Sequence, residues 1–232
     1  MKRITVLLAD DHTVVREGFR HMLELEADFE VIGEAADGRQ AVALAVKLRP
    51  DVVLMDIAMP RLNGLEATRQ VLEALPSAKV IILSSHNDDA RVETSVNSGA
   101  AGFLFKQDSA HDVCHAIREV HKGKTIFSPA IAKRFGRLHP RSSARAVTLK
   151  PSLTQLTSRQ MEVLQLIAEG KANKQMAAEL GIGLKTVEKH REHVMQKLDI
   201  HDTAGLTRYA ISAGIIENSV HLTIEATTPP GT

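Results

Sequence analysis

The first half of the chain alternates short aliphatic runs with longer segments in which apolar residues recur at helical spacing. Apolar runs between polar residues are typical of buried parallel strands, and apolar positions three and four apart are typical of amphipathic helices. We therefore predict an α/β doubly wound sheet of five parallel strands. The strands are expected at residues 4–9, 30–35, 52–55, 80–83 and 103–105. The helices are expected at residues 12–26, 38–48, 63–75, 88–98 and 109–122.

The last third of the chain keeps only the helical spacing. Thr157 is expected to cap a first helix and Asn173 a second. Further helices are expected over residues 184–198 and 202–213. The second and third of these helices are separated only by the Gly-Ile-Gly sequence at 181–183. Two helices joined by a three-residue glycine turn predict a helix-turn-helix.

Between these two parts the helical spacing is lost. A short helix begun by Ser128-Pro129 is expected at residues 128–137, and the Pro-, Ser- and Arg-rich residues 139–152 are typical of an exposed linker. Residues 219–232 are polar and are expected to form a tail. The predicted division is a sheet domain at 1–124, a short helix and linker at 125–152, a helix-turn-helix domain at 153–217 and a tail at 218–232.

Four of the predicted strands end in polar side chains suited to phosphoryl chemistry. The set is Asp10, Asp11, Asp56, Ser84 and Lys106. Since ligands of open parallel sheets bind outside the carboxyl ends of the strands, we expect these groups to converge at one edge. Carboxylates with a backbone carbonyl and water suit Mg²⁺, a carboxylate can attack phosphorus, and a lysine can pair with a phosphoryl oxygen. The pattern therefore predicts a metal site beside a nucleophile and a cation.

One polar face of the helix expected at 184–198 has the chemistry of a DNA reader. Lys185, Glu188, Lys189 and Glu192 lie on it, and Glu188 can accept from cytosine N4 while Lys189 can donate to guanine. Residues 1–127 contain 15 Lys and Arg and 19 Asp and Glu, whereas the remaining residues contain 14 and 9. A basic half beside an acidic half indicates nucleic acid as the partner of the basic half.

The composition argues against a membrane or secreted protein. No apolar run reaches the roughly 20 residues of a membrane-spanning helix, and the first residues lack the apolar region of a signal peptide. The single Cys114 cannot form an internal disulfide, which fits a reducing compartment. We expect a cytoplasmic protein with no membrane partner.

The first 120 residues resemble the receiver domain of two-component response regulators. The matching residues are Asp10-Asp11, the sequence DIAMPRLNG at 56–64, Ser84, Phe103 and Lys106. The resemblance implies a flavodoxin-like fold and an Asp56 that accepts phosphate from a phosphohistidine of a sensor histidine kinase. It also implies Mg²⁺ (or Mn²⁺) held by Asp10, Asp11, Asp56 and the backbone carbonyl of Ala58.

The same resemblance implies a switch pair. Ser84 would move toward the phosphoryl group, and the ring of Phe103 would turn inward into the vacated space. Phe103 stands where Tyr is commoner, so its switching would be steric only. Gln107 stands where many receivers have Pro, which argues against the cis peptide found there, because a non-Pro cis bond costs about 3 kcal/mol.

Residues 156–216 resemble the LuxR-type DNA-binding domain, most visibly at 163–170 and 185–191. With the receiver, the chain resembles a NarL/FixJ-type response regulator, which is a phosphorylation-switched transcription regulator. The resemblance implies that Lys185 and Thr186 anchor the DNA backbone, while Glu188, Lys189 and Glu192 face base edges. Two departures are predicted to weaken local hydrogen bonds: Gln160 replaces a usual Glu, and Gly183 replaces a common Ser.

The resemblance also implies partners and regulation. Double-stranded promoter DNA, a sensor histidine kinase and RNA polymerase are the expected partners. The unphosphorylated receiver would mask the recognition helix, and phosphorylation would favour a homodimer on DNA through the helix at 202–213. The chain would not be a turnover enzyme, since its chemistry is self-phosphorylation and self-dephosphorylation at Asp56.

Two alternatives remain. A phosphatase of haloacid-dehalogenase type also uses an Asp nucleophile, but it requires a second Asp two residues later, where this chain has Ala58. A regulator that binds DNA without regard to phosphate would not need the complete set Asp10, Asp11, Asp56, Ser84 and Lys106.

Overall fold

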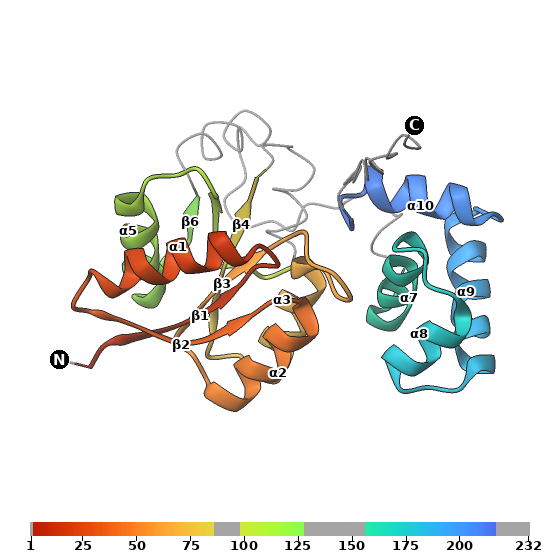
Figure 1. Ribbon diagram of the computed structural model, residues 1–232, viewed down its shortest axis with the longest axis horizontal. Coiled ribbons are helices and arrows are strands. Elements are labelled where there is room, and N and C mark those ends of the chain that lie inside the picture. The colour runs from red at the N-terminus through yellow and green to blue at the C-terminus, as the bar shows by residue number, and fades with distance from the viewer. Residues whose placement is uncertain (1, 86–97, 128–155, 217–232) are drawn as a thin grey trace, which may run out of the picture.

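The computed structural model describes residues 2–85, 98–127 and 156–216. A parallel sheet covered by helices occupies the N-terminal part, and a bundle of helices occupies the C-terminal part (Figure 1). The strands are β1 (Ile4–Ala9), β2 (Phe29–Ala35), β3 (Val52–Asp56), β4 (Lys79–Ser84), β5 (Gly102–Phe105) and β6 (Ile126–Phe127). The helices are α1 (Thr13–Glu24), α2 (Gly38–Leu48), α3 (Gly64–Ala74), α5 (Ala110–His121), α7 (Ser158–Ala168), α8 (Asn173–Leu180), α9 (Leu184–Leu198) and α10 (Thr203–Ser212).

The sheet has the order β2-β1-β3-β4-β5-β6, and every described pairing is parallel. The predicted doubly wound α/β class is confirmed, but the prediction of five strands is wrong. The additional strand, β6, pairs with Gly102 and Phe103 of β5. A two-residue strand is too short to show as an apolar run in the sequence. The helix expected at 88–98, the short helix at 128–137, the linker and the tail lie outside the described residues.

Helices cover both faces of the sheet. Alternate residues of β1 point to opposite faces, so that Leu7 packs with α2 and α3 while Leu8 packs with α1 and α5. The strands β1, β3 and β4 are therefore buried on both sides, which explains their nearly continuous apolar sequences. The arrangement leaves the carboxyl ends of the strands as the open edge of the sheet.

The loop from β3 to α3 (residues 57–63, the β3–α3 loop) is held tightly by two glycines. A Cβ on Gly64 would lie 1.8 Å from the carbonyl oxygen of Asp56, and a Cβ on Gly38 would lie 2.0 Å from the carbonyl oxygen of Leu62. The backbone N–H of Gly64 donates to the carbonyl of Ile57 at 2.8 Å. Since only glycine permits these close approaches, the loop has little room to move without disturbing both helices.

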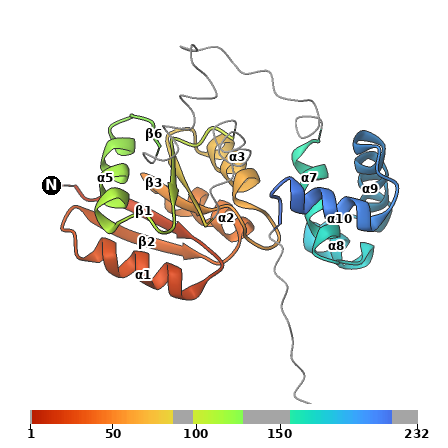
Figure 2. The ribbon, with the colours of Figure 1, turned by 90° about the horizontal axis from the view of Figure 1, so that it is seen from above.

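The C-terminal helices share a separate apolar core that includes Val163, Leu166, Met176, Val187 and Leu206. The helices α8 and α9 are joined by residues 181–183, and Gly181 has a φ of +63°, which glycine adopts without strain. This confirms the predicted helix-turn-helix. In both views the bundle lies on the side of the sheet where α2 and α3 are found (Figures 1 and 2).

The helix caps follow the sequence in most places. The Thr157 side chain accepts from the backbone N–H of Gln160, and the Gln160 side chain accepts from the backbone N–H of Thr157 at 3.0 Å. Both hydrogen bonds of the capping box therefore form although Gln160 stands where Glu is usual. Gly183 provides no side-chain cap to α9, as expected. The prediction that Asn173 caps α8 is wrong, because Ala172 occupies the cap position and donates to the Gln175 side chain at 2.9 Å.

No cis peptide bond occurs in the described ranges, and the Lys106–Gln107 bond is trans. None of the helices in the described part of the chain has the length and apolar character needed to cross a bilayer.

Candidate functional site

Three strand ends bring two carboxylates and an ammonium group together. Asp10 follows β1, Asp56 ends β3, and Lys106 follows β5. The Nζ atom of Lys106 lies 2.7 Å from Oδ2 of Asp10 and 2.9 Å from Oδ2 of Asp56. All three side chains are largely buried. The parallel topology thus places two acidic side chains and one basic side chain within contact distance.

The environment of Asp56 makes its charge unfavourable. Burial raises the pKa of Asp56 most, the positive charge of Lys106 opposes this, and the nearby negative charges of Asp10 and Asp11 raise it again, so that the pKa is about 7. Burial lowers the pKa of Lys106, but the charges of Asp56 and Asp10 more than offset this and raise it. A second cation among these carboxylates would favour ionised Asp56.

The donor set fits a small divalent cation. Ligand atoms of Asp10, Asp11, His12 and Asp56 all lie within 4.8 Å of one another. The carboxylates of Asp10 and Asp56 are buried, while Asp11 is more exposed. Clustered carboxylate oxygens suit Mg²⁺ or Mn²⁺, and the carbonyl of the half-buried Ala58 comes two residues after Asp56.

His12 is a member of this cluster that the sequence pattern did not indicate. Its Nδ1 lies 2.8 Å from Oδ1 of Asp11, and its backbone N–H donates to Oδ1 of Asp10 at 2.9 Å. His12 also precedes α1, so the bond from its N–H helps fix the Asp10 carboxylate at the start of that helix. In the sequence, the sign that His12 belongs to this cluster is its position directly after two aspartates.

Ser84 and Phe103 lie next to this cluster on neighbouring strands. Ser84 is buried at the end of β4 and pairs with Phe105, and its carbonyl accepts from the backbone N–H of Lys106 at 2.9 Å. The ring of Phe103 is fully buried and meets Phe105 edge to face, with centroids 5.9 Å apart. The ring of Phe103 is therefore enclosed by the protein in this structure.

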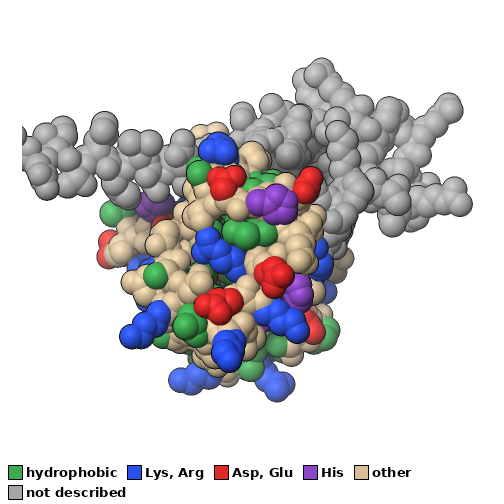
Figure 3. Space-filling view, turned by 90° about the vertical axis from the view of Figure 1, so that its right-hand side faces the viewer, with side chains coloured by type: hydrophobic (Ala, Val, Ile, Leu, Met, Phe, Trp, Pro, Cys, Tyr) green, Lys and Arg blue, Asp and Glu red, His purple; other side chains and the backbone are tan. Residues whose placement is uncertain are grey.

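The second candidate site is the outer face of α9. Val187 and Val194 are fully buried and fix which side of the helix faces the core. The opposite side presents the predicted DNA-contacting residues, all of them exposed: Lys185, Thr186, Glu188, Lys189 and Glu192. Lys, Arg, Asp, Glu and His side chains are interspersed over this side of the molecule (Figure 3). A helix with its polar face open to solvent is available to the major groove.

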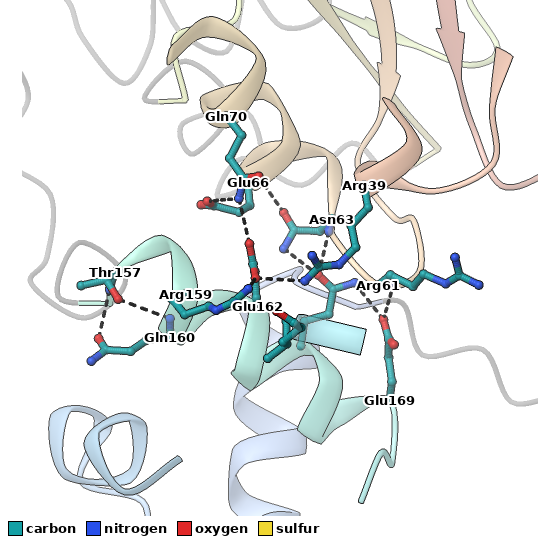
Figure 4. Close-up of polar contacts among 12 residues, drawn as sticks. Arg39, Arg61, Asn63, Glu66, Gln70, Thr157, Arg159, Gln160, Glu162 and Glu169 are labelled. Carbon is teal, nitrogen blue, oxygen red and sulfur yellow. Dashed lines mark hydrogen bonds and ion pairs between the residues drawn. The ribbon is translucent and has the colours of Figure 1, made fainter. Parts of the chain in front are cut away.

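A third cluster of polar residues joins α7 to the sheet part, and the sequence pattern did not indicate it. Gln165 and Glu162 of α7 contact the β3–α3 loop, α2 and α3. Figure 4 shows Glu162 between Arg39 and Gln70. Both side chains are buried although they are polar. Polar residues in a helix otherwise rich in apolar residues were the only signal in the sequence, and their partners lie more than 90 residues away.

Comparisons with known proteins cover nearly the whole chain. Residues 6–118 match the family model described as "Response regulator receiver domain", and residues 154–210 match that described as "Bacterial regulatory proteins, luxR family". The chain is 42% identical to the transcriptional regulatory protein LiaR of Bacillus subtilis, over 89% of this chain and 96% of that protein. It is 36% identical to the response regulator protein VraR of Staphylococcus aureus, over 92% of this chain and 99% of that protein.

Solved structures agree in fold. A structure of two RcsB dimers bound to two parallel DNAs matches with a TM-score of 0.58 and 25% identity, over 91% of this chain and 99% of that chain. The response regulator ChrA of a heme-sensing two-component system matches with a TM-score of 0.51 and 29% identity, over 93% of this chain and 100% of that chain. Both matches span the sheet part and the helical part together.

Proposed function

Because the chain belongs to the two-component response regulators that join a receiver domain to a LuxR-type DNA-binding domain, we propose that phosphorylation of Asp56 switches its binding to promoter DNA. Its family is one of DNA-binding transcription regulators, not of metabolic enzymes. The observation that carries the proposal is the meeting of Asp10, Asp56 and Lys106 at one sheet edge.

In the proposed step, an oxygen of Asp56 attacks phosphorus of a phosphohistidine on a sensor histidine kinase. The new O–P bond replaces the N–P bond, and the imidazole leaves with the electron pair. The carboxylates of Asp10, Asp11 and Asp56 and the Ala58 carbonyl would hold Mg²⁺. When bound, this cation withdraws charge from the phosphoryl oxygens.

The side chains around Asp56 have separate proposed roles. Lys106 contacts the Asp56 carboxylate and can shift to a phosphoryl oxygen once the carboxylate is esterified. Ser84 would donate to another phosphoryl oxygen, and Phe103 would respond to the space that Ser84 leaves. Burial at the sheet edge limits water around the acyl phosphate. The site therefore retains a phosphoryl group rather than turning over a substrate.

The proposed output is DNA binding by α9. Lys185 and Thr186 are assigned to the DNA backbone, and Glu188, Lys189 and Glu192 are assigned to base edges. The RcsB structure with dimers on DNA supports a homodimer of this chain, for which α10 is the proposed contact. RNA polymerase is a proposed further partner. A cytoplasmic location and the division into residues 1–124, 125–152, 153–217 and 218–232 are part of this proposal.

The switch is tested by measuring affinity for DNA fragments of the organism's own promoters, with and without acetyl phosphate, at fixed salt. We expect the donor to increase the affinity for the best fragments and to increase the dimer fraction in analytical ultracentrifugation. Equal affinity and equal dimer fraction with fully phosphorylated protein would rule out the switch while leaving the DNA-binding assignment intact.

A further inference from the structure

His12 lies beside the acidic cluster with its ring turned toward two carboxylates. Its Nδ1 atom is 2.8 Å from Oδ1 of Asp11 and 3.3 Å from Oδ1 of Asp10, and the rest of the side chain is largely open to solvent. In the described part of the chain, the ring makes no polar contact other than these two. His12 occupies the cap position of α1, but its side chain does not cap the helix. The position of the ring therefore relates to the acidic cluster and not to helix capping.

The ring nitrogen stands at the distance expected of a neighbouring metal ligand. Bonds of about 2.1 Å to a six-coordinate cation, at right angles to one another, separate adjacent ligand atoms by about 3 Å. The two distances from Nδ1, 2.8 Å and 3.3 Å, lie on either side of this value. One ligand atom from each of Asp10, Asp11, His12 and Asp56 lies within 4.8 Å of the other three. One nitrogen and three oxygens thus surround a single position.

The two oxygens of the Asp10 carboxylate face different partners. Its Oδ2 atom lies 2.7 Å from Nζ of Lys106, and the Oδ2 atom of Asp56 lies 2.9 Å from the same nitrogen. Its Oδ1 atom faces the ring and the backbone N–H of His12 instead. A cation beside His12 would therefore not need to displace the ammonium group of Lys106.

The backbone that carries His12 is held in place by two residues. The backbone N–H of His12 donates to Oδ1 of Asp10 at 2.9 Å. The carbonyl of Asp10 accepts from Nη1 of Arg16 at 2.6 Å, and Nε of Arg16 donates to Oε2 of Glu34 at 3.2 Å. The Arg16 side chain is largely buried. Since hydrogen-bonded partners of this kind fix the orientation of metal ligands, the segment presents its carboxylates and its ring in a defined geometry.

The distances from Nδ1 also fit hydrogen bonds from the ring to the carboxylates, so two roles of His12 must be separated. As a donor, Nδ1 carries a proton that points at the oxygens, and this proton would face any cation bound there. As a ligand, Nδ1 offers its lone pair and Nε2 carries the proton. A ring that only donates would position the carboxylates for every divalent cation alike. A ring that ligates would favour the cations that accept nitrogen.

From these contacts, and resting on the proposed function, we propose that His12 is a nitrogen ligand of the metal ion that the acidic site binds. Imidazole nitrogen favours first-row transition ions such as Fe²⁺, Co²⁺ and Zn²⁺, whereas Mg²⁺ takes oxygen ligands. Three carboxylates with one imidazole therefore select a transition-metal dication over Mg²⁺, which still binds through the oxygens alone. The phosphoryl chemistry at Asp56 then depends on which of these ions is available.

Selectivity is tested on the full chain by displacement of bound Mn²⁺, with free Mn²⁺ measured by electron paramagnetic resonance. Co²⁺ and Mg²⁺ are the competing ions, each at a buffered free concentration. His12→Asn removes the imidazole and keeps a residue suited to a helix cap. His121→Asn is the matched control, because His121 is an exposed histidine outside the acidic cluster. We expect His12→Asn to weaken Co²⁺ binding by at least about 10-fold and Mg²⁺ binding by less than about 2-fold, and the control to match the wild type.

A second readout detects the ligand nitrogen itself. Electron spin echo envelope modulation of the Mn²⁺ complex reports nitrogen nuclei bound directly to the metal. We expect such modulation in the wild type and in His121→Asn, and none in His12→Asn. Isotopic labelling of the histidine nitrogens alone should change the modulation of the wild type.

Two results would overturn the ligand role of His12. One is a wild-type complex with bound Mn²⁺ and no nitrogen coupling. The other is a change in Co²⁺ affinity that equals the change in Mg²⁺ affinity in His12→Asn, which would leave the ring as a hydrogen-bond donor to the carboxylates. Failure of the wild type to bind any of the three cations would instead overturn the proposed function.

Discussion

Asp56 is the residue whose chemistry can be tested most simply, because its charge is unfavourable where it stands. The folded pKa is about 7 against an ordinary value of 3.8, so the folded protein binds more protons than the unfolded chain between these values. Stability contributed by protonated Asp56 is present at low pH and is lost as pH rises through 7. The shift, which already includes the opposing charge of Lys106, corresponds to at most roughly 4 kcal/mol.

Asp56→Asn removes this cost while keeping the shape of the side chain. In buffer containing a chelator, we expect the variant to gain unfolding free energy over the wild type at pH 8 and to gain less at pH 5. Urea unfolding at the two pH values measures the difference. A gain that does not change with pH would show that Asp56 is already ionised without a cation.

Replacing either of two lysines of α9 with alanine should change DNA binding in a different way. Lys189→Ala is expected to lose about 1–3 kcal/mol of affinity at its cognate base pair and to relax sequence preference there. Lys185→Ala is expected to weaken all duplexes alike and to reduce the slope of log affinity against log salt by about 1. Binding titrations over a salt series with cognate and unrelated duplexes separate the two. Identical behaviour of the variants would contradict their assigned roles.

At the scale of elements, the sequence predicted what depends on local pattern. The strand ends at Asp56 and Ser84 and the cap at Thr157 follow from apolar runs and cap chemistry. The acidic cluster was predictable because parallel topology brings strand ends together. The contacts of Glu162 and Gln165 were not, since a helix sequence shows which positions are polar but not which distant loop will satisfy them. His12 was missed because the pattern drew attention only to carboxylates.

The turn before α9 offers a matched pair of glycine substitutions. Gly183 has φ −67° and ψ 150°, which any residue adopts, and a Cβ there meets only Thr186 at 3.8 Å. Gly183→Ser should therefore stabilise the domain by about 0.5–1 kcal/mol through capping and reduced unfolded-chain entropy. Gly181→Ser should destabilise it, because φ is +63° there. Thermal unfolding measures the change in stability of each variant. A change of the same sign in both variants would contradict the turn geometry.

At the scale of the whole molecule, the contact of Gln165 with the β3–α3 loop and the recognition helix α9 are separate surfaces. Breaking this contact should therefore leave binding to an arbitrary duplex containing one site nearly unchanged, within about 2-fold, because the DNA-facing residues of α9 are exposed while the contact is made. Gln165→Ala and the wild type are compared by fluorescence anisotropy at fixed salt. A large gain for the variant would mean that docking covers the DNA-reading face after all.

The proposed regulation of the whole chain rests on phosphoryl transfer to Asp56. The most direct measurement is the intact mass of the full-length protein after incubation with acetyl phosphate and Mg²⁺, for the wild type, Asp56→Asn and the exposed control Asp112→Asn. We predict one added phosphoryl group on the wild type and on the control, and none on Asp56→Asn. Undiminished labelling of Asp56→Asn, or no labelling of the wild type, would contradict the account.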